Sequence, residues 1–335
     1  MNDREYGCMV LGQRMFSLSV IGVTNRFTRR LHAGLLRVFG LVRRLGLPGC
    51  ARAKAPRIAA GIIVVLGAGV SSSRAAFLHP ETGPIAQETV ARPTSFDHSA
   101  FSQLLNLYVK RGIVDYDAFA RASEFHAYLG SLGRTDPSAL GRDDQLAFWI
   151  NTYNAYTIQL IIEHHERQSI RNINRSFGFV KAYGPWKEKL AVVGGHAYGL
   201  DEIEQDIIRP RFHEPRIHFA LVCAAMGCPP LRNEAYAGNR LESQLDNEAR
   251  FFLLESPSKN RVDVDTRTMY VSPVFVGFRD YIKDFGGNNR AVGQFIAHYY
   301  PEGPAKRLLE TGDFKTIQTE YDWTLNSKEN ARSKP

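Results

Sequence analysis

One stretch decides the fold of this 335-residue chain: Arg216-Ile-His-Phe-Ala-Leu-Val-Cys-Ala-Ala-Met-Gly-Cys-Pro-Pro-Leu-Arg232. Its β-branched and aromatic residues from Ile217 to Cys223 predict a strand. A turn of small residues then brings Cys228 to Pro229-Pro230, and proline favours the first position of a helix. A thiol at a helix N-terminus faces free backbone N–H groups and the positive end of the helix dipole, which favours the reactive thiolate.

Cys228 has three interpretations that the sequence leaves open. As a nucleophile it would attack an acyl carbon and form a thioester. As half of a disulfide it would pair with Cys223, since five residues around a turn can meet the distance limits of that bond. As a buried thiol it would be inert, because free cysteine is among the most buried residue types.

His218 stands on the predicted strand with Ala220 and Val222 on the same face. An imidazole among small side chains suits a general base beside a cleft. A core histidine that bonds a backbone carbonyl explains the pattern equally well. The geometry around the ring decides between the two.

The longest helical periodicity covers about residues 144–166, with Asn151 and Asn154 three positions apart on one flank. Their amides could orient an imidazole or donate to an oxyanion. Alternatively they bridge the helix to a loop, because buried amides usually bond backbone groups.

Acidic residues and metal motifs give weaker signals. Asp201, Glu202 and Glu204 could supply an acid or a metal ligand. They open a predicted helix that Pro210 should end, so capping explains them best. His164-His165-Glu166 lacks the i, i+4 spacing of a zinc-binding helix face. The sequence therefore predicts no metal and no cofactor.

The basic charge is concentrated at the N-terminus. The whole chain has a formal net charge of +8, from 42 Lys or Arg and 34 Asp or Glu. Residues 1–75 hold 12 of the basic and 2 of the acidic residues, so the remainder carries about −2. Nucleic-acid binding is not expected of the folded part.

Residues 58–70 form an apolar run that follows Arg52, Lys54 and Arg57 and precedes small residues. This pattern is typical of a secretory signal peptide, and an uncleaved membrane anchor is the alternative. We expect an exported protein, periplasmic or membrane-anchored, that touches the membrane only through this leader. Such a location permits a disulfide between Cys223 and Cys228.

Four parts follow from composition: a basic leader over residues 1–76, a linker over 77–94, a domain over 95–325 and a polar tail over 326–335. Helical periodicity recurs at about 96–109, 118–132, 144–166 and 239–254, with hairpins at 191–198 and 261–271. The fold class expected is α+β, a single mainly helical domain with a small sheet. A papain-like arrangement is one form it could take.

Four ordered blocks carry a resemblance to a known family: Gln145-Leu-Ala-Phe-Trp-Ile-Asn-Thr-Tyr-Asn-Ala155, Pro185-Trp-Lys-Glu-Lys189, Leu200-Asp-Glu-Ile-Glu204, and His218-Phe-Ala-Leu through Cys228-Pro-Pro-Leu231. They resemble the signature of the domain of unknown function family 547, over about residues 95–325. The resemblance implies an often exported bacterial protein and gives no substrate. Where the family usually reads Ile-Glu-His, this chain has Gln205, so a catalytic histidine at that position would be missing.

Two hypotheses about function follow. The first is an exported cysteine-dependent hydrolase or acyltransferase that acts on amide or thioester bonds of a peptide or acyl compound. Cys228 would be its nucleophile, His218 its base, and Asn151 or Asn154 its orienting or oxyanion-stabilising amide. The second is a non-catalytic periplasmic binding or scaffolding module stapled by a Cys223–Cys228 disulfide.

Overall fold

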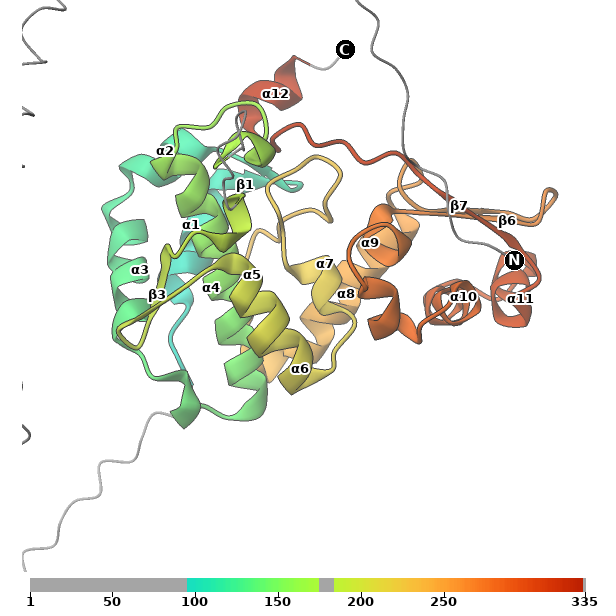
Figure 1. The fold of residues 1–335 in the computed structure, drawn as a ribbon, viewed down its shortest axis with the longest axis horizontal. Helices are drawn as coiled ribbons and strands as arrows, with labels where there is room; N and C mark the ends of the chain where they lie inside the picture. The colour runs from blue at the N-terminus through green and yellow to red at the C-terminus, as the bar shows by residue number, and fades with distance from the viewer. Residues whose placement is uncertain (1–94, 175–183, 334–335) are drawn as a thin grey trace, which may run out of the picture. The chain divides into compact units, whose positions relative to one another are not determined.

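The computed structural model describes residues 95–174 and 184–333. The predicted leader and linker lie outside these residues. The described part is an α+β fold of many helices with three small sheets, so the predicted fold class is confirmed (Figure 1). Across the part of the chain described here, no helix is long and apolar enough to cross a membrane.

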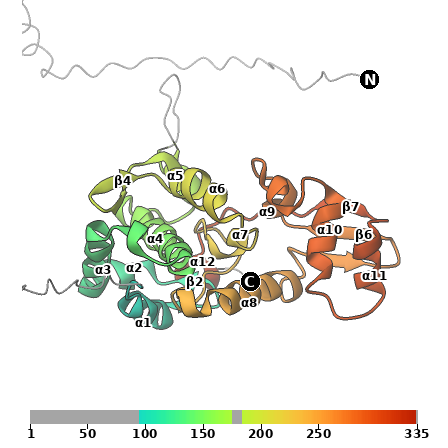
Figure 2. The same cartoon turned by 90° about the horizontal axis from the view of Figure 1, so that it is seen from below.

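Helix α4 is the centre of the first hydrophobic core. All its residues from Leu146 to Ile161 are buried, the polar side chains of this stretch included. Helices α1 to α3 pack on one side of it, and the chain from α5 to α6 lies on the other (Figures 1 and 2). The predicted helix 118–132 is interrupted at Ala122, where the backbone is extended. The bounds are α1 Ser99–Tyr108, α2 Tyr116–Arg121, α3 Ser123–Arg134 and α4 Arg142–Glu163.

Helix α5, Leu200–Glu202, continues through a π-helical segment, η4 Ile203–Ile208, into α6, Arg209–Phe212. The predicted stop at Pro210 is therefore wrong. Proline clashes with the carbonyl four residues back in an α-helix, and the wider π turn just before Pro210 relieves that conflict. The predicted cap at Asp201 is also replaced, because Glu202 Oε2 accepts the Gly199 N–H at 3.2 Å.

The strand predicted from Ile217 to Cys223 is wrong as well. Residues Ile217–Ala220 form a short helix, α7, and the chain after them is irregular. Among residues 95–174 and 184–333 no strand pairs with this segment, and strand propensity is easily overridden by such context. Pro229-Pro230 begins no helix either; the next α-helix is α8, Leu241–Leu254. Cys228 thus lacks the helix N-terminus that the sequence predicted for it.

A second core holds the C-terminal part of the domain, and α7 and α8 connect the two. Leu241 and Leu245 of α8 belong to the first core, whereas Phe252 belongs to the second. A three-stranded sheet of order β5-β6-β7 flanks this second core, with β6 and β7 parallel. The bounds are β5 Arg261–Asp263, β6 Thr268–Val271, α9 Pro273–Val276, α10 Asn289–Ala297, α11 Pro304–Thr311 and β7 Lys315–Gln318.

The two predicted hairpins are confirmed. Strands β3, Ala191–Val193, and β4, His196–Tyr198, turn at Gly194 and Gly195, both with positive φ, and β5 pairs with β6. A shorter pair, β1 Val109–Lys110 and β2 Ile113–Val114, follows α1.

The end of the chain, whose composition predicts a polar tail from residue 326, returns to the first core. Asn326 is buried; its Oδ1 accepts from Tyr116 Oη at 2.6 Å and its Nδ2 donates to Gly112 O at 2.9 Å. Helix α12, Lys328–Arg332, follows. The polar side chain at the start of this tail thus bonds buried groups.

Candidate functional site

A pocket of about 260 Å³ lies where the two cores meet. Its walls come from α4, the α5–η4 segment, α7 with the following loop, the turn after α9, and the C-terminal segment. His218 and Cys228, both predicted as site residues, line this pocket. Two of the four predicted site residues therefore lie at one pocket.

The two cysteines form a pair in the pocket wall. Their Sγ atoms lie at disulfide distance and their Cα atoms are 6.4 Å apart. Tyr321 Oη lies 3.0 Å from each sulfur, and the Cys223 N–H donates to Cys228 Sγ at 3.1 Å. Of the three interpretations of Cys228, this geometry favours the disulfide.

His218 is directed at a carboxylate and not at a sulfur. Its ring is buried, and Nε2 lies 2.7 Å from Asp284 Oδ2. Burial acts to raise the pKa of Asp284, but hydrogen bonds from His218 and Arg209 outweigh it and lower that pKa to about 2. Among the described residues no hydrogen bond joins His218 to Cys228, so a nucleophile–base pair is not assembled.

Asn151 and Asn154 each clamp a backbone segment with both ends of the amide. Asn151 bonds the C=O and N–H of Tyr236 at 2.8 and 2.9 Å. Asn154 donates to Ala220 O at 2.9 Å and accepts from the Val222 N–H at 3.0 Å. Neither amide lines the pocket. The structure thus places them as bridges from helix to loop, which was the alternative to an oxyanion role.

Glu204, for which helix capping was the favoured interpretation, does not take that place, because Glu202 accepts the Gly199 N–H. The Glu204 side chain lines the pocket although the residue is only 6% exposed. Burial raises its pKa, against the charge of His218 and a hydrogen bond with Tyr281 that act to lower it. A buried carboxyl with a perturbed pKa at the wall of a pocket is typical of functional sites.

The π-helical segment explains how Glu204 is aimed. The N–H of Arg209 bonds the C=O of Glu204, five residues earlier. Residues five apart therefore align, and both reach Tyr281: Glu204 by a hydrogen bond, and Arg209 with its guanidinium carbon 5.2 Å from the ring centre. The sequence carries no local signal of a π turn, although such turns are frequent at functional sites.

Arg279 is the pocket's arginine. Its Nη2 donates to both Oδ1 and Oδ2 of Asp201 at 2.7 Å. Its backbone has φ 42°, in the left-handed region that non-glycine residues seldom adopt. Asp201, for which helix capping was also the favoured interpretation, thus forms an ion pair with Arg279.

Aromatic rings make up much of the remaining wall. Phe278, Tyr321 and Trp323 contact one another with ring centres 4.6 to 5.6 Å apart, and Trp186 lies 6.1 Å from Trp323. These pairs are tilted or edge-to-face, which are favoured aromatic geometries.

Gln205, where the resemblance implied a histidine, faces a wider neighbouring hollow of about 1070 Å³. Its Oε1 accepts from Arg209 Nη1, and its buried Nε2 has no partner among the described residues. The hollow shares Trp186, Asp201 and Arg279 with the pocket, so the two are adjacent. Gln205 itself does not line the pocket.

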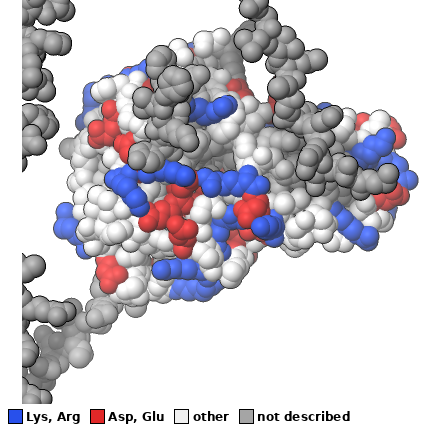
Figure 3. Space-filling view, viewed as in Figure 1, with Lys and Arg blue, Asp and Glu red and all other residues white. Residues whose placement is uncertain are grey.

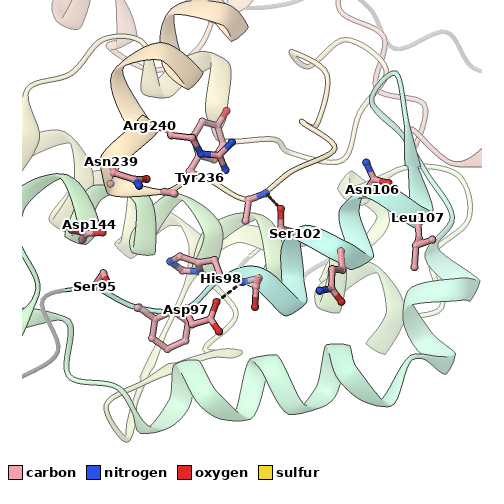
Figure 4. Close-up of a pocket in the computed structure, with 16 residues that line it drawn as sticks. Ser95, Asp97, His98, Ser102, Asn106, Leu107, Asp144, Tyr236, Asn239 and Arg240 are labelled. Carbon is pink, nitrogen blue, oxygen red and sulfur yellow. Dashed lines mark hydrogen bonds between the residues drawn. The ribbon is translucent and has the colours of Figure 1, made fainter.

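A third depression, of about 1020 Å³, lies between the start of α1 and residues 235–240 (Figure 4). Its polar groups are engaged in the fold: Asp97 accepts the Ser99 N–H at 2.8 Å and His98 Nδ1 lies 2.7 Å from Tyr128 Oη. Burial lowers the pKa of His98 to about 4, so its ring is neutral at pH 7. None of the predicted site residues lines it, and we do not place the functional site there.

The described residues contain no group of three or more His, Cys, Asp or Glu side chains that could hold a metal ion. On the face shown in Figure 3, Lys and Arg side chains are interspersed with Asp and Glu.

The fold and the site define an α+β protein with a small pocket that holds a buried acid. The family model described as "Protein of unknown function, DUF547" matches residues 137–253, and the predicted resemblance is confirmed over these residues. The match includes Glu204, His218 and both cysteines, and it ends before Arg279 and Tyr321. No curated protein and no solved structure matches the chain.

Proposed function

We propose that this protein is a small-molecule-binding module whose ligand occupies the pocket beside Glu204. The buried carboxyl of Glu204 carries the proposal. Burying an acid is costly unless it is paired, and no cationic side chain is hydrogen-bonded to Glu204 among the described residues. A ligand that hydrogen-bonds this carboxyl would offset the cost of its burial.

The pocket suits a compact ligand. Its volume lies just below the roughly 300–1,000 Å³ of common ligand sites. Mostly apolar walls with a few convergent polar groups are the usual composition of such sites. Here aromatic rings supply the walls, and Glu204, Tyr281 and Arg279 supply the polar groups.

In this proposal the Cys223–Cys228 pair is a staple. It closes the loop after α7, and that loop forms one wall of the pocket. We propose in addition that the protein is exported, because the basic and apolar leader and a disulfide both fit an oxidising compartment.

Thermal shifts with a fragment library test the pocket. Leu221→Phe enlarges a side chain in the pocket wall, and Leu107→Phe makes the same change in the depression of Figure 4. We expect stabilising fragments to act on the wild type and on Leu107→Phe but not on Leu221→Phe. Fragments that stabilise Leu221→Phe equally, or a library in which none stabilises the wild type, would contradict the proposal.

A cysteine-dependent hydrolase or acyltransferase is the second candidate, because Cys228 and His218 line the same pocket. It requires free thiols, whereas the staple requires none. Thiol titration of the non-reduced protein separates the two candidates. Two free thiols, one alkylated unusually fast near neutral pH and lost in Cys228→Ser, would favour the hydrolase; no free thiols would favour the binding module.

A further inference from the structure

Arg279 has hydrogen-bonding capacity that the fold leaves unused. Its bonds to Asp201 run through Nη2 alone, and Nε and Nη1 bond no described residue. The side chain is 48% exposed and lines both the pocket and the neighbouring hollow. A free guanidinium edge matches a carboxylate, which it binds through two parallel hydrogen bonds.

The backbone at Arg279 has an unfavourable conformation that its neighbours keep in place. Its left-handed φ of 42° costs energy that the surroundings must offset. The next residue, Asp280, is fixed by an ion pair with Arg209 at 2.9 Å, and Phe278 just before packs on Tyr321. Strained residues that the fold holds in this way are concentrated at ligand-binding sites.

We propose that the pocket binds a small unsaturated carboxylate, with the carboxylate on Arg279 and the flat body among Phe278, Tyr321 and Trp323. This inference rests on the proposed function of the pocket and names its ligand class. Planar π systems pack well against tilted aromatic rings, which the wall already provides.

Charge in the rest of the pocket is compatible with an anion. Burial favours the neutral form of Glu204, which would not repel a carboxylate and could donate to it. Asp201 is negative but already shared with Arg279. His218 and Tyr281 face the site from α7 and from the turn after α9, and neither carries a negative charge near pH 7.

A cationic ligand is the competing class, because aromatic faces and an ionised Glu204 attract ammonium groups. Arg279 argues against it, since a second cation at the mouth would be repelled. The test must therefore compare ligands of one shape and different charge.

Benzoate, benzamide and benzylammonium form such a set and can be titrated by calorimetry near pH 7, with tryptophan fluorescence as a second readout. Trp186 and Trp323 line the pocket, and the third tryptophan, Trp149, is buried beside Tyr198. Arg279→Gln removes the charge and Arg279→Lys keeps the charge without the fork. Arg171→Gln is the matched control, because Arg171 packs on Trp323 but does not line the pocket.

We expect benzoate to bind the wild type and Arg171→Gln at least about tenfold more tightly than benzamide, the worth of a charge-assisted hydrogen bond. Arg279→Gln should abolish the preference and Arg279→Lys should retain part of it. Equal binding of benzoate and benzamide, or tighter binding of benzylammonium, would overturn the carboxylate while leaving a ligand pocket in place. Binding of none of the three at millimolar concentration would count against the carboxylate, and the fragment screen then decides on the pocket itself.

Discussion

Asn154→Ala is the substitution that best separates a structural amide from a catalytic one. It removes the two hydrogen bonds that hold the backbone at Ala220 and Val222, at 2.9 and 3.0 Å. Each bond contributes about 1 kcal/mol net, and a buried group left unsatisfied costs about 1–3 kcal/mol. Allowing for partial relaxation, we expect a loss of about 3 kcal/mol in the free energy of unfolding.

For a domain of this size, about 1 kcal/mol corresponds to a change of roughly 2–4 °C in Tm. The melting temperature of Asn154→Ala should therefore fall by about 6–12 °C, measured by circular dichroism or calorimetry. Asn106→Ala is the control: Asn106 is exposed on α1, and its loss should leave Tm nearly unchanged. Asn151→Ala should resemble Asn154→Ala, because Asn151 clamps Tyr236 in the same way.

An unchanged Tm for Asn154→Ala would refute this reasoning. So would loss of a measurable activity in a variant of wild-type stability, because an amide that only clamps backbone acts through the fold. A fall in Tm with ligand affinity reduced in parallel would agree with the structural role.

Three further predictions concern charge and sulfur. The fold raises the pKa of Glu204, so ionisation of this carboxyl opposes folding. As pH rises above about 4.5, Glu204→Gln should therefore become more stable relative to the wild type. A difference in free energy of unfolding that does not change with pH would contradict this. The fold lowers the pKa of Asp284 to about 2, so this carboxylate stabilises the fold at pH values above its ordinary pKa of 3.8 and loses that contribution as pH falls toward 2. In Asp284→Asn, unfolding experiments should lack this loss of stability at acid pH. If the loss persisted, the contact with His218 would be contradicted. Dithiothreitol should lower the free energy of unfolding of the wild type by about 2 kcal/mol, the contribution of a disulfide that closes a short loop. It should leave the free energy of unfolding of Cys223→Ser/Cys228→Ser unchanged. Equal effects on the two proteins would argue against the disulfide.

The sequence predicted those elements whose pattern is local. Periodicity located α1, α4 and α8, and paired glycines located the β3–β4 turn. The proximity of Cys223 and Cys228 also followed from local spacing. In each case neighbouring residues alone determine the structure, so one sequence suffices.

The rest depended on contacts between distant segments. The stretch from Ile217 to Cys223 has the composition of a strand. No strand of the described part of the chain pairs with it, and Asn154 bonds its backbone instead. His218 meets Asp284, 66 positions later, so its partner could not be inferred from its own strand-like surroundings. The place of Glu204 in the pocket wall was not predicted, because capping offers a local explanation for an acid at a helix start.

Because of the π turn at η4, the number of residues between Glu204 and Arg209 determines how the two side chains are placed at the site. Each residue advances an α-helix by about 100°, so deleting one residue between Glu204 and Arg209 would swing the two apart around the axis by about that angle. Point substitutions in this segment can preserve the alignment on Tyr281, but a single-residue deletion cannot. Members of the family that differ by one residue here would therefore present a different acid, or none, to the same pocket.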